Sequence, residues 1–477
     1  MDLDKDLRAR QEARDLAKVS ACAQKQLAKM SQQQLDKIAE AIYRAFYASA
    51  SELAELAVRE TGFGNVNDKT TKNQFASKTL WQAIENMKTV GVLKESPGEK
   101  LWEIGVPVGV IAAIVPSTNP TSTVCYKAMI ALKAGCSIIF SPHPKAIDCT
   151  LRAVNIVAKA AEAAGAPSGS VAALTVPSLD GCRELMGAPE TDLILATGGT
   201  AMVKAAYSSG KPAIGVGAGN GPAYIHRSAD VGKALACILE SKTFDYGTVC
   251  ASEQSIIVEK DMEETVRSQA AAMGFYFMSQ QQADSLAKRL FKPNGMLSPD
   301  VVGKSATALA ELAGFSVPNQ TKVLVAREQE AGPTRPYSME KLCPVLAFFV
   351  MESEDAVLSK VVEVLTHEGT GHTFAIHAED KAVVRRFALE VPVSRFLVNT
   401  PAALGGIGAS TNLFPALTLG CGAAGGSASS NNISPMDLIN IRRVAWDAQT
   451  ETKKDAQEDQ LVEILTAKIL ERLDKHF

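Results

Sequence analysis

The stretch VGVIAAIVPSTNPTS, residues 108–122, decides the fold of this chain. Its apolar first half, residues 108–115, has the composition of a buried strand, and its polar second half is a turn that opens a helix through residue 132. The alternation continues downstream, with strands expected at 137–140, 171–176, 193–197 and 213–216 and helices between them, one at 146–164. This βαβα succession predicts an α/β fold with a doubly wound parallel sheet, which binds ligands beyond the carboxyl ends of its strands.

Three loops at those strand ends are candidates for ligand contacts: residues 116–122, residues 141–145 and Thr197-Gly-Gly-Thr200. The last loop precedes a helix expected over 201–208, so its backbone N–H groups suit a phosphate, although a plain helix cap explains it equally well. Residues 215–222, GVGAGNGP, match the GxGxxG pattern in part, but Pro222 spoils a helix start after them. We interpret this segment as a loop of close approach in the cleft.

Asn119 stands in the polar turn directly after the first strand and before Pro120. Its side-chain amide can donate a hydrogen bond to a developing oxyanion. Taken by itself, the loop favours the simpler interpretation, in which a turn asparagine bonds its own backbone.

Cys250 lies in the segment FDYGTVCASEQSIIV, residues 244–258, between a helix expected at 231–242 and a strand expected at 255–258. A thiol in such a turn, with Gly247 allowing close backbone approach, can be presented to a cleft as a nucleophile. For a cysteine considered alone, a small buried apolar residue is the better interpretation.

The composition excludes several classes of protein. A chain of 477 residues with a formal net charge of -3 gives no reason to expect nucleic acid or an anionic membrane as a partner. The 9 cysteines form no CxxC pair, so no metal site is expected. Their odd number and the absence of a signal-peptide pattern favour a reducing, cytoplasmic location. The longest apolar runs contain glycine and proline and are too short to span a bilayer.

The two ends of the chain are expected to be helical. Apolar residues recur at helical spacing up to about residue 92, including a helix over 69–87, and we interpret this region as a packing layer that carries no chemistry. Residues 447–460, DAQTETKKDAQEDQ, have almost no large apolar side chain and are interpreted as a solvated linker. Residues 461–477 form an amphipathic helix, which either docks on its own subunit or serves as a tethered recognition segment.

Taken together and in order, these motifs resemble the aldehyde dehydrogenase superfamily, and most closely its coenzyme A-acylating branch. The resemblance covers VPSTNPTS, SPHPK, TGG, GVGAGN, FDYGTVCASEQ, EGTGHT, NTP and LTLGCG. It implies a Rossmann-like cofactor domain at 1–227 that includes the N-terminal helices, a catalytic domain at 228–424, and a return to an oligomerisation arm at 425–446. The arm is expected around residues 101–105 and 432–444, and it implies a dimer or a dimer of dimers.

The resemblance also implies a mechanism. Cys250 attacks the aldehyde carbon, Asn119 and the Cys250 backbone N–H hold the oxyanion, hydride passes to NAD, or to NADP, and coenzyme A takes the acyl group. Hydrolytic relatives carry a glutamate in the glycine-rich loop to activate water, and here residues 215–221 contain no acid. His372 is a secondary candidate that could face the cleft and help deprotonate coenzyme A; a histidine that only bonds a loop backbone is as good an interpretation. The residues expected at the cofactor are Ser141, His143, Pro144, Thr197, Gly198, Gly199, Thr200, Gly217, Gly219 and Glu340.

Acetaldehyde and propionaldehyde are the expected substrates, because the resemblance is closest to enzymes for them. Two alternatives remain: a hydrolytic dehydrogenase that releases free acid, and a catalytically silent assembly subunit. The C-terminal helix resembles the encapsulation peptides of acylating dehydrogenases that are packaged in bacterial microcompartments, which implies a shell protein as partner.

Overall fold

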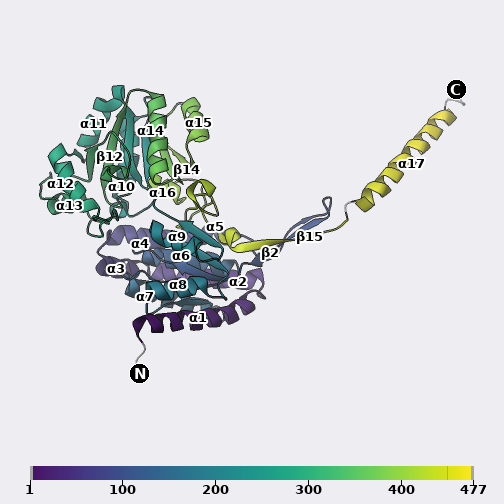
Figure 1. Cartoon of the computed structure of the whole chain (residues 1–477). Helices are drawn as coiled ribbons and strands as arrows, with labels where there is room; N and C mark the ends of the chain where they lie inside the picture. The colour runs from purple at the N-terminus through teal and green to yellow at the C-terminus, as the bar shows by residue number, and fades with distance from the viewer. Residues whose placement is uncertain (1–3, 448, 474–477) are drawn as a thin grey trace.

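The computed structural model describes residues 4–447 and 449–473 (Figure 1). They form two α/β bodies that pack against each other, a strand arm that leaves them, and a final helix beyond the arm. Within the described ranges, no helix is long and apolar enough to cross a membrane.

The first body is built on a five-stranded parallel sheet, as the alternating pattern predicts. Its strand order is β5-β4-β3-β6-β7. The chain builds the sheet outward from β3 on one side and then returns to the other side, so a crevice opens between the loops that follow β3 and β6. The bounds are β3 (Val110–Ile114), β4 (Ser137–Ser141), β5 (Val171–Ala173), β6 (Leu193–Thr197) and β7 (Ala213–Val216).

Both faces of this sheet are covered, which explains why its strands are continuously apolar. Along β3, Ile111 and Ala113 point into one core cluster with α2, α6 and α7, whereas Val110, Ala112 and Ile114 point into another with α1, α8 and α9. The helices are α1 (Lys5–Leu27), α2 (Gln32–Ala48), α3 (Ala50–Thr61), α4 (Val66–Gln74), α5 (Leu80–Ile84), α6 (Pro120–Lys133), α7 (Ile147–Ala163), α8 (Leu179–Gly187) and α9 (Thr200–Tyr207). The single helix expected over 69–87 is interrupted by a π turn, Phe75–Thr79, between α4 and α5.

The second body is built on a seven-stranded parallel sheet of order β10-β11-β12-β9-β8-β13-β14. Its strands are β8 (Gly221–Ile225), β9 (Glu253–Glu259), β10 (Phe275–Phe277), β11 (Val323–Arg327), β12 (Val345–Met351), β13 (Gly371–His377) and β14 (Val393–Val398). Its helices are α10 (Val231–Thr243), α11 (Glu263–Ala272), α12 (Gln280–Leu290), α13 (Ala306–Leu312), α14 (Glu354–His367), α15 (Lys381–Glu390) and α16 (Ala402–Gly406).

The boundary between the two bodies differs from the expected one at residue 227. Strand β8 lies before that boundary, yet it pairs with β9 and β13 of the seven-stranded sheet. The crossing from one sheet to the other is therefore the glycine-rich loop between β7 and β8. Sequence periodicity cannot place this boundary, because β7 and β8 are equally apolar and only their pairing partners distinguish them.

The arm is a three-stranded antiparallel sheet of β1 (Gly91–Ser96), β2 (Leu101–Pro107) and β15 (Ile439–Ala445). Strand β1 was not expected in the arm, and it begins inside the region that was expected to be helical up to about residue 92. The last strand is shorter than the expected segment 432–444, because β15 begins at Ile439. Residues 432–438 instead return to the first body, where the Tyr126 hydroxyl donates to the Ile433 carbonyl and the Cys136 thiol to the Leu438 carbonyl.

The C-terminal segment differs from the expected linker and helix. Residues 449–460 form the first half of one helix, α17 (Gln449–Leu473), because their glutamate, lysine, glutamine and alanine residues are strong helix formers even without an apolar face. The helix points away from the rest of the chain (Figure 1). Leu461, Val462, Leu465, Ile469 and Leu470 are 52–60% exposed, so the structure does not dock this stripe on its own subunit. Residues 474–477 of the predicted helix lie outside the described residues.

Candidate active site

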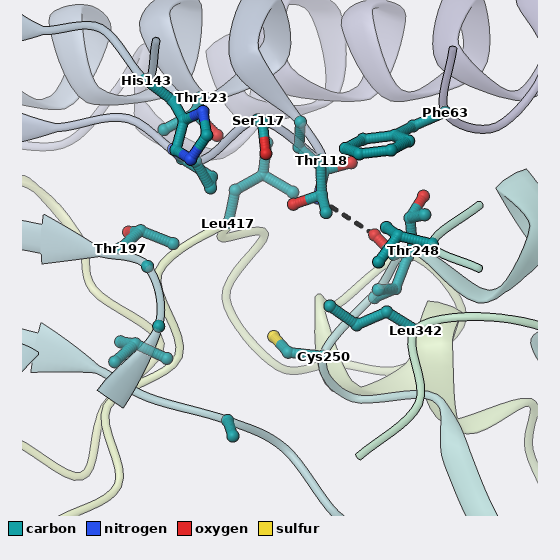
Figure 2. Close-up of a pocket in the computed structure, with 18 of the residues that line it drawn as sticks. Phe63, Ser117, Thr118, Thr123, His143, Thr197, Thr248, Cys250, Leu342 and Leu417 are labelled. Carbon is teal, nitrogen blue, oxygen red and sulfur yellow. Dashed lines mark hydrogen bonds between the residues drawn. The ribbon is translucent and has the colours of Figure 1, made fainter. Parts of the chain in front are cut away.

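A pocket with about 380 Å³ of free space lies where the carboxyl ends of the five-stranded sheet face the seven-stranded sheet. This volume falls in the range of small-molecule sites. The residues that follow β3, β4, β6 and β7 line one side of the pocket, and those before β9 line the other. Figure 2 shows the Cys250 sulfur directed into the space between Thr197 on one side and Thr118 and Thr248 on the other.

Cys250 is placed by a tight turn between α10 and β9. The short 3₁₀ segment Phe244–Gly247 precedes it, and Asp245 and Tyr246 both adopt positive φ angles, 49° and 51°, which only surrounding contacts can hold. The partly exposed Cys250 side chain lies against the pocket. Its removal from bulk solvent and the neighbouring Glu340 carboxyl raise the pKa of the thiol to about 12, so Cys250 is a thiol at neutral pH until a base or a positive charge reaches it.

Asn119 lines the same pocket, at the N-cap of α6. Its Nδ2 donates to the Thr248 carbonyl at 3.0 Å and, at 3.3 Å, to the Thr118 hydroxyl. Its Oδ1 accepts a hydrogen bond from the Lys72 ammonium at 2.7 Å. The amide is therefore bound to a side chain of α4 and to the backbone before Cys250 as well as to its own loop, which a self-contained turn asparagine would not need.

The glycine-rich loop between β7 and β8 approaches Cys250 closely, and the sequence predicts it as a loop of close approach. A Cβ atom added at Gly219 would lie 1.9 Å from the Cys250 carbonyl oxygen, so only glycine fits there. The Gly219 N–H donates to the Glu340 carboxylate at 2.8 Å. Among the described residues that line the pocket, Glu340 is the one carboxylic acid. Burial and the nearby Glu368 raise the pKa of Glu340 to about 8.

Glycines keep the crevice at the edge of the five-stranded sheet open. A Cβ atom added at Gly199 or Gly217 would meet no protein atom within 4 Å, and one added at Gly198 would come no closer than 3.9 Å, to Met202. All three glycines line the pocket. Gly199 is the N-cap of α9 and has no side chain to cap it, so the first N–H groups of the helix can bind a phosphate.

The predicted cofactor residues divide into two groups. Those that line the pocket are His143, Thr197, Gly198, Gly199, Gly217 and Glu340. The other four do not line it. Ser141 is buried at the end of β4, whereas Pro144 and Thr200 are exposed. Gly219 is buried against the Cys250 backbone. Lys145 belongs to the loop 141–145 that the sequence offers for ligand contacts, but it was not among the residues expected at the cofactor. It lines the pocket, although its neighbour Pro144 does not.

His372 does not face the cleft as expected. It is fully buried at the start of β13, and its Nδ1 lies 2.8 Å from the Thr373 hydroxyl. Burial and the positive charge of Arg395 hold the pKa of His372 well below its ordinary value. Since it is absent from the pocket lining, its role as a base for coenzyme A has no geometric support. His372 is instead part of the buried strand β13.

The site also contains residues from the N-terminal region, which was expected to carry no chemistry. Phe63 and Lys72 line the pocket, and Lys72 contacts both Asn119 and Asp245. A helical lysine normally indicates a solvated face, so periodicity alone assigns it to the surface. The sequence offers one clue to their role, which is that Lys69 and Lys72 stand one turn apart on the same helix. Only the structure shows that both are buried.

Comparison with known proteins agrees with this fold. The aldehyde dehydrogenase family model matches residues 6–275, more than half of the chain, and the chain therefore belongs to the aldehyde dehydrogenase family. It is 44% identical over 432 residues to the bifunctional aldehyde-alcohol dehydrogenase AdhE of Escherichia coli, a match that covers 90% of this chain and 48% of that protein. The chain thus spans about half the length of this bifunctional relative. It is 35% identical over 434 residues to the succinate-semialdehyde dehydrogenase (acetylating) of Clostridium kluyveri, covering 91% of this chain and 95% of that protein.

Three solved structures share the architecture. An acetylating aldehyde dehydrogenase from Geobacillus thermoglucosidasius matches with a TM-score of 0.91 and 46% identity, over 94% of this chain and 98% of the other. A propionaldehyde dehydrogenase of Rhodopseudomonas palustris, solved with bound propionyl-CoA, matches with a TM-score of 0.82 and 27% identity, over 91% and 94%. A propionaldehyde dehydrogenase from a fucose-utilisation bacterial microcompartment of Clostridium phytofermentans matches with a TM-score of 0.82 and 28% identity, over 90% and 96%.

Proposed function

We propose that this protein is a coenzyme A-acylating aldehyde dehydrogenase that oxidises a short-chain aldehyde to its acyl-CoA with NAD, through a thioester on Cys250. The observation that carries the proposal is the convergence of Cys250, Asn119 and two glycine-bearing loops on one pocket. Relatives and solved structures described as acetylating, or solved with bound propionyl-CoA, support it. A catalytically silent assembly subunit has no need of this convergence.

The first step forms a bond between the Cys250 sulfur and the aldehyde carbon. The thiol proton leaves to a base, and the carbonyl π electrons move to the oxygen, which becomes an oxyanion. Asn119 Nδ2 and the backbone N–H of Cys250 are the donors we assign to that oxyanion. The 3.3 Å contact from Asn119 to the Thr118 hydroxyl is the weaker of its two bonds, so this N–H is the one that the oxyanion takes over.

In the second step, the oxyanion collapses to a carbonyl and the carbon loses hydride, which leaves a thioester on Cys250. The nicotinamide of NAD supplies the hydride acceptor when it is bound. Gly198, Gly199 and the start of α9 are the groups we assign to its phosphates, and Glu340 is the group we assign to the adjacent ribose. The preference for NAD over NADP is part of the same proposal.

The last step transfers the acyl group to the thiol of coenzyme A. The coenzyme A sulfur bonds to the acyl carbon and gives up its thiol proton, and the bond from that carbon to Cys250 breaks. The leaving Cys250 sulfur takes up a proton, so the enzyme thiol is regenerated. The glycine-rich loop carries no acid that would activate water in competition. Glu340 lines the pocket, but burial raises its pKa to about 8, so it is protonated at neutral pH and is a poor base for activating water. Its side chain also accepts the Gly219 N–H.

Acetaldehyde and propionaldehyde are the substrates we propose. Cys250 packs against the same apolar cluster as Leu417 and Leu419, and Ile407 also belongs to the pocket lining. Apolar walls of this kind suit an aldehyde with a short hydrocarbon chain. The propionaldehyde dehydrogenases among the solved structures support the same substrate class.

The test is the reduction of NAD⁺ by acetaldehyde and by propionaldehyde, with and without coenzyme A. Reduction that depends on coenzyme A and yields acyl-CoA is the expected result. Equal reduction without coenzyme A, with release of free acid, would replace the proposal with the hydrolytic alternative. No reduction with either aldehyde, by a protein that is folded and binds nucleotide, would favour the silent assembly subunit.

We further propose that α17 directs the enzyme into a protein-shelled microcompartment by helix-to-helix contact. The exposed apolar stripe of α17 supports this role, and so does the likeness to a dehydrogenase from a microcompartment. Enclosure suits a volatile and reactive substrate.

The proposal also includes assembly as a dimer or a dimer of dimers through the strand arm. There Trp102 and Trp446 pack edge-on with their ring centres 4.9 Å apart, and their side chains remain 37% and 47% exposed.

A reporter fused to residues 461–477 tests the role of α17 in a cell that makes such a shell. Punctate reporter signal is expected, and a chain truncated after residue 447 should keep its activity and lose the punctate location. A diffuse reporter in shell-producing cells would count against the proposal. The matched control is the same peptide with Leu465 and Ile469 replaced by glutamate, which removes the apolar stripe and keeps the length.

A further inference from the structure

Helix α4 places two lysines, one turn apart, beneath the loop that carries Asn119. Lys69 and Lys72 are each 3% exposed. The Lys69 ammonium donates to the Thr118 carbonyl at 2.8 Å, and the Lys72 ammonium donates to Asn119 Oδ1 at 2.7 Å. Burying a charge without a partner is costly, so these two cations require an arrangement that compensates them.

Asp245 provides that compensation from the turn that precedes Cys250. Its fully buried carboxylate binds Lys69 at 2.9 Å and Lys72 at 2.5 Å, and it also accepts from the Thr248 hydroxyl. Burial opposes ionisation, yet the two lysines hold the pKa of Asp245 below its ordinary value. Asp68 adds a second carboxylate, which accepts the Asp245 N–H. The cluster of Lys69, Lys72, Asp245 and Asp68 therefore links α4 to the Asn119 loop and to the turn before Cys250. These segments are far apart in the sequence.

The position of Lys72 determines which end of the Asn119 amide faces the pocket. An ammonium group only donates hydrogen bonds, so the amide oxygen must point to Lys72 and the amide nitrogen must point away from it. Lys72 also donates to the carbonyl and the hydroxyl of Thr248, both at 3.2 Å, and these bonds fix the ammonium itself. If Lys72 were absent, the amide oxygen would lose its donor, and the orientation of the amide would depend on the bonds from Nδ2 to the Thr248 carbonyl and the Thr118 hydroxyl. An amide that turned its oxygen toward the oxyanion would repel it.

We propose that Lys72, held by Asp245, is a positioning residue that orients the Asn119 amide as an oxyanion donor and strengthens its N–H groups. The inference rests on the proposed function, because it acts through the oxyanion of that reaction. An amide whose oxygen accepts a bond from a cation is a stronger donor through its nitrogen. Donors that are fixed before the reaction need no reorganisation when negative charge develops.

A double-mutant cycle in the full-length protein tests this role. Lys72→Met should lower kcat/KM for the aldehyde about 10- to 100-fold in the otherwise unchanged chain, with an unchanged KM for NAD⁺. In the Asn119→Ala background the same substitution should cost about twofold or less, because no amide is left to orient. Lys69→Met is the matched comparison: it removes the other cation of Asp245 but touches no atom of the Asn119 side chain, so its cost should be the same in both backgrounds.

The outcomes distinguish this inference from the proposed function. An equal cost of Lys72→Met in both backgrounds would overturn the positioning role and leave the proposed function intact. A wild-type kcat in Asn119→Ala would overturn the positioning role and the assignment of Asn119 as an oxyanion donor, whereas the proposed activity is decided separately by the dependence of NAD⁺ reduction on coenzyme A. If Lys72→Met fails to fold as judged by thermal unfolding, the cycle is run with Lys72→Met combined with Asp245→Asn, which removes both charges of the pair together. The same expectation of non-additivity applies to that variant.

Discussion

Gly219→Ala adds one methyl group at the point where the glycine-rich loop meets the nucleophile. The new Cβ would lie 1.9 Å from the Cys250 carbonyl oxygen and 2.8 Å from its carbonyl carbon. A carbon and a carbonyl oxygen approach to about 3.3 Å at closest in ordinary structures. The loop or the Cys250 backbone must therefore move by about 1.4 Å, and both contacting atoms belong to backbone that cannot rotate away.

A shift of that size at the nucleophile is costly to catalysis. A misplacement of about 1 Å lowers the rate about 10²-fold, so Gly219→Ala should lower kcat/KM for the aldehyde by at least about that factor. The steady-state rate of NAD⁺ reduction with aldehyde and coenzyme A measures the effect. Calorimetric binding of NAD⁺ and thermal unfolding should show a folded protein that still binds nucleotide.

Gly217→Ala is the matched comparison, since it adds the same methyl group to the same loop. Its Cβ would meet no protein atom within 4 Å. Gly217 lines the pocket on the side that we assign to the cofactor. We therefore expect kcat to stay near the wild-type value and any change to be limited to the KM for nucleotide. A Gly219→Ala enzyme with kcat/KM within about threefold of wild type would refute the argument from close approach.

Four further predictions follow from single residues. Cys250→Ser should reduce aldehyde oxidation to background in a folded protein, because a serine hydroxyl without a base is a far poorer nucleophile, and retained activity would remove Cys250 from its assigned role. Asn119→Ala should lower kcat about 10²- to 10³-fold with little change in nucleotide affinity measured by calorimetry. Because burial raises the pKa of the Cys250 thiol to about 12, its alkylation by iodoacetamide without nucleotide should accelerate about tenfold per pH unit from pH 7 to 10, and a plateau near pH 8 would contradict the raised pKa. Ser31→Ala removes the side-chain cap that accepts the Gln34 N–H at the start of α2 and should lower the free energy of unfolding by about 1 kcal/mol, whereas Ser49→Ala, at a helix start without such a bond, should change it little.

Most of the fold was predictable from local patterns in the sequence. The strands at β3, β4, β6 and β7 coincide with apolar runs, and polar turns end them where the pocket opens, because a parallel sheet covered on both faces needs continuously apolar strands. The glycine-rich loop was likewise predictable as a point of close approach. Its contact with Cys250 follows from the absence of a side chain at Gly219.

By itself the sequence determined which chemistry-bearing residues stand at strand ends, Cys250 and Asn119 among them, because turns and strands are set by neighbouring residues. The tertiary structure alone decided that β8 joins the second sheet, that His372 is buried and that Lys72 binds both Asn119 and Asp245. These three facts depend on pairing between distant segments. A lysine on a helix has the same local pattern whether its ammonium meets water or a buried carboxylate, and only the packed chain brings Asp245 to within 2.5 Å of Lys72.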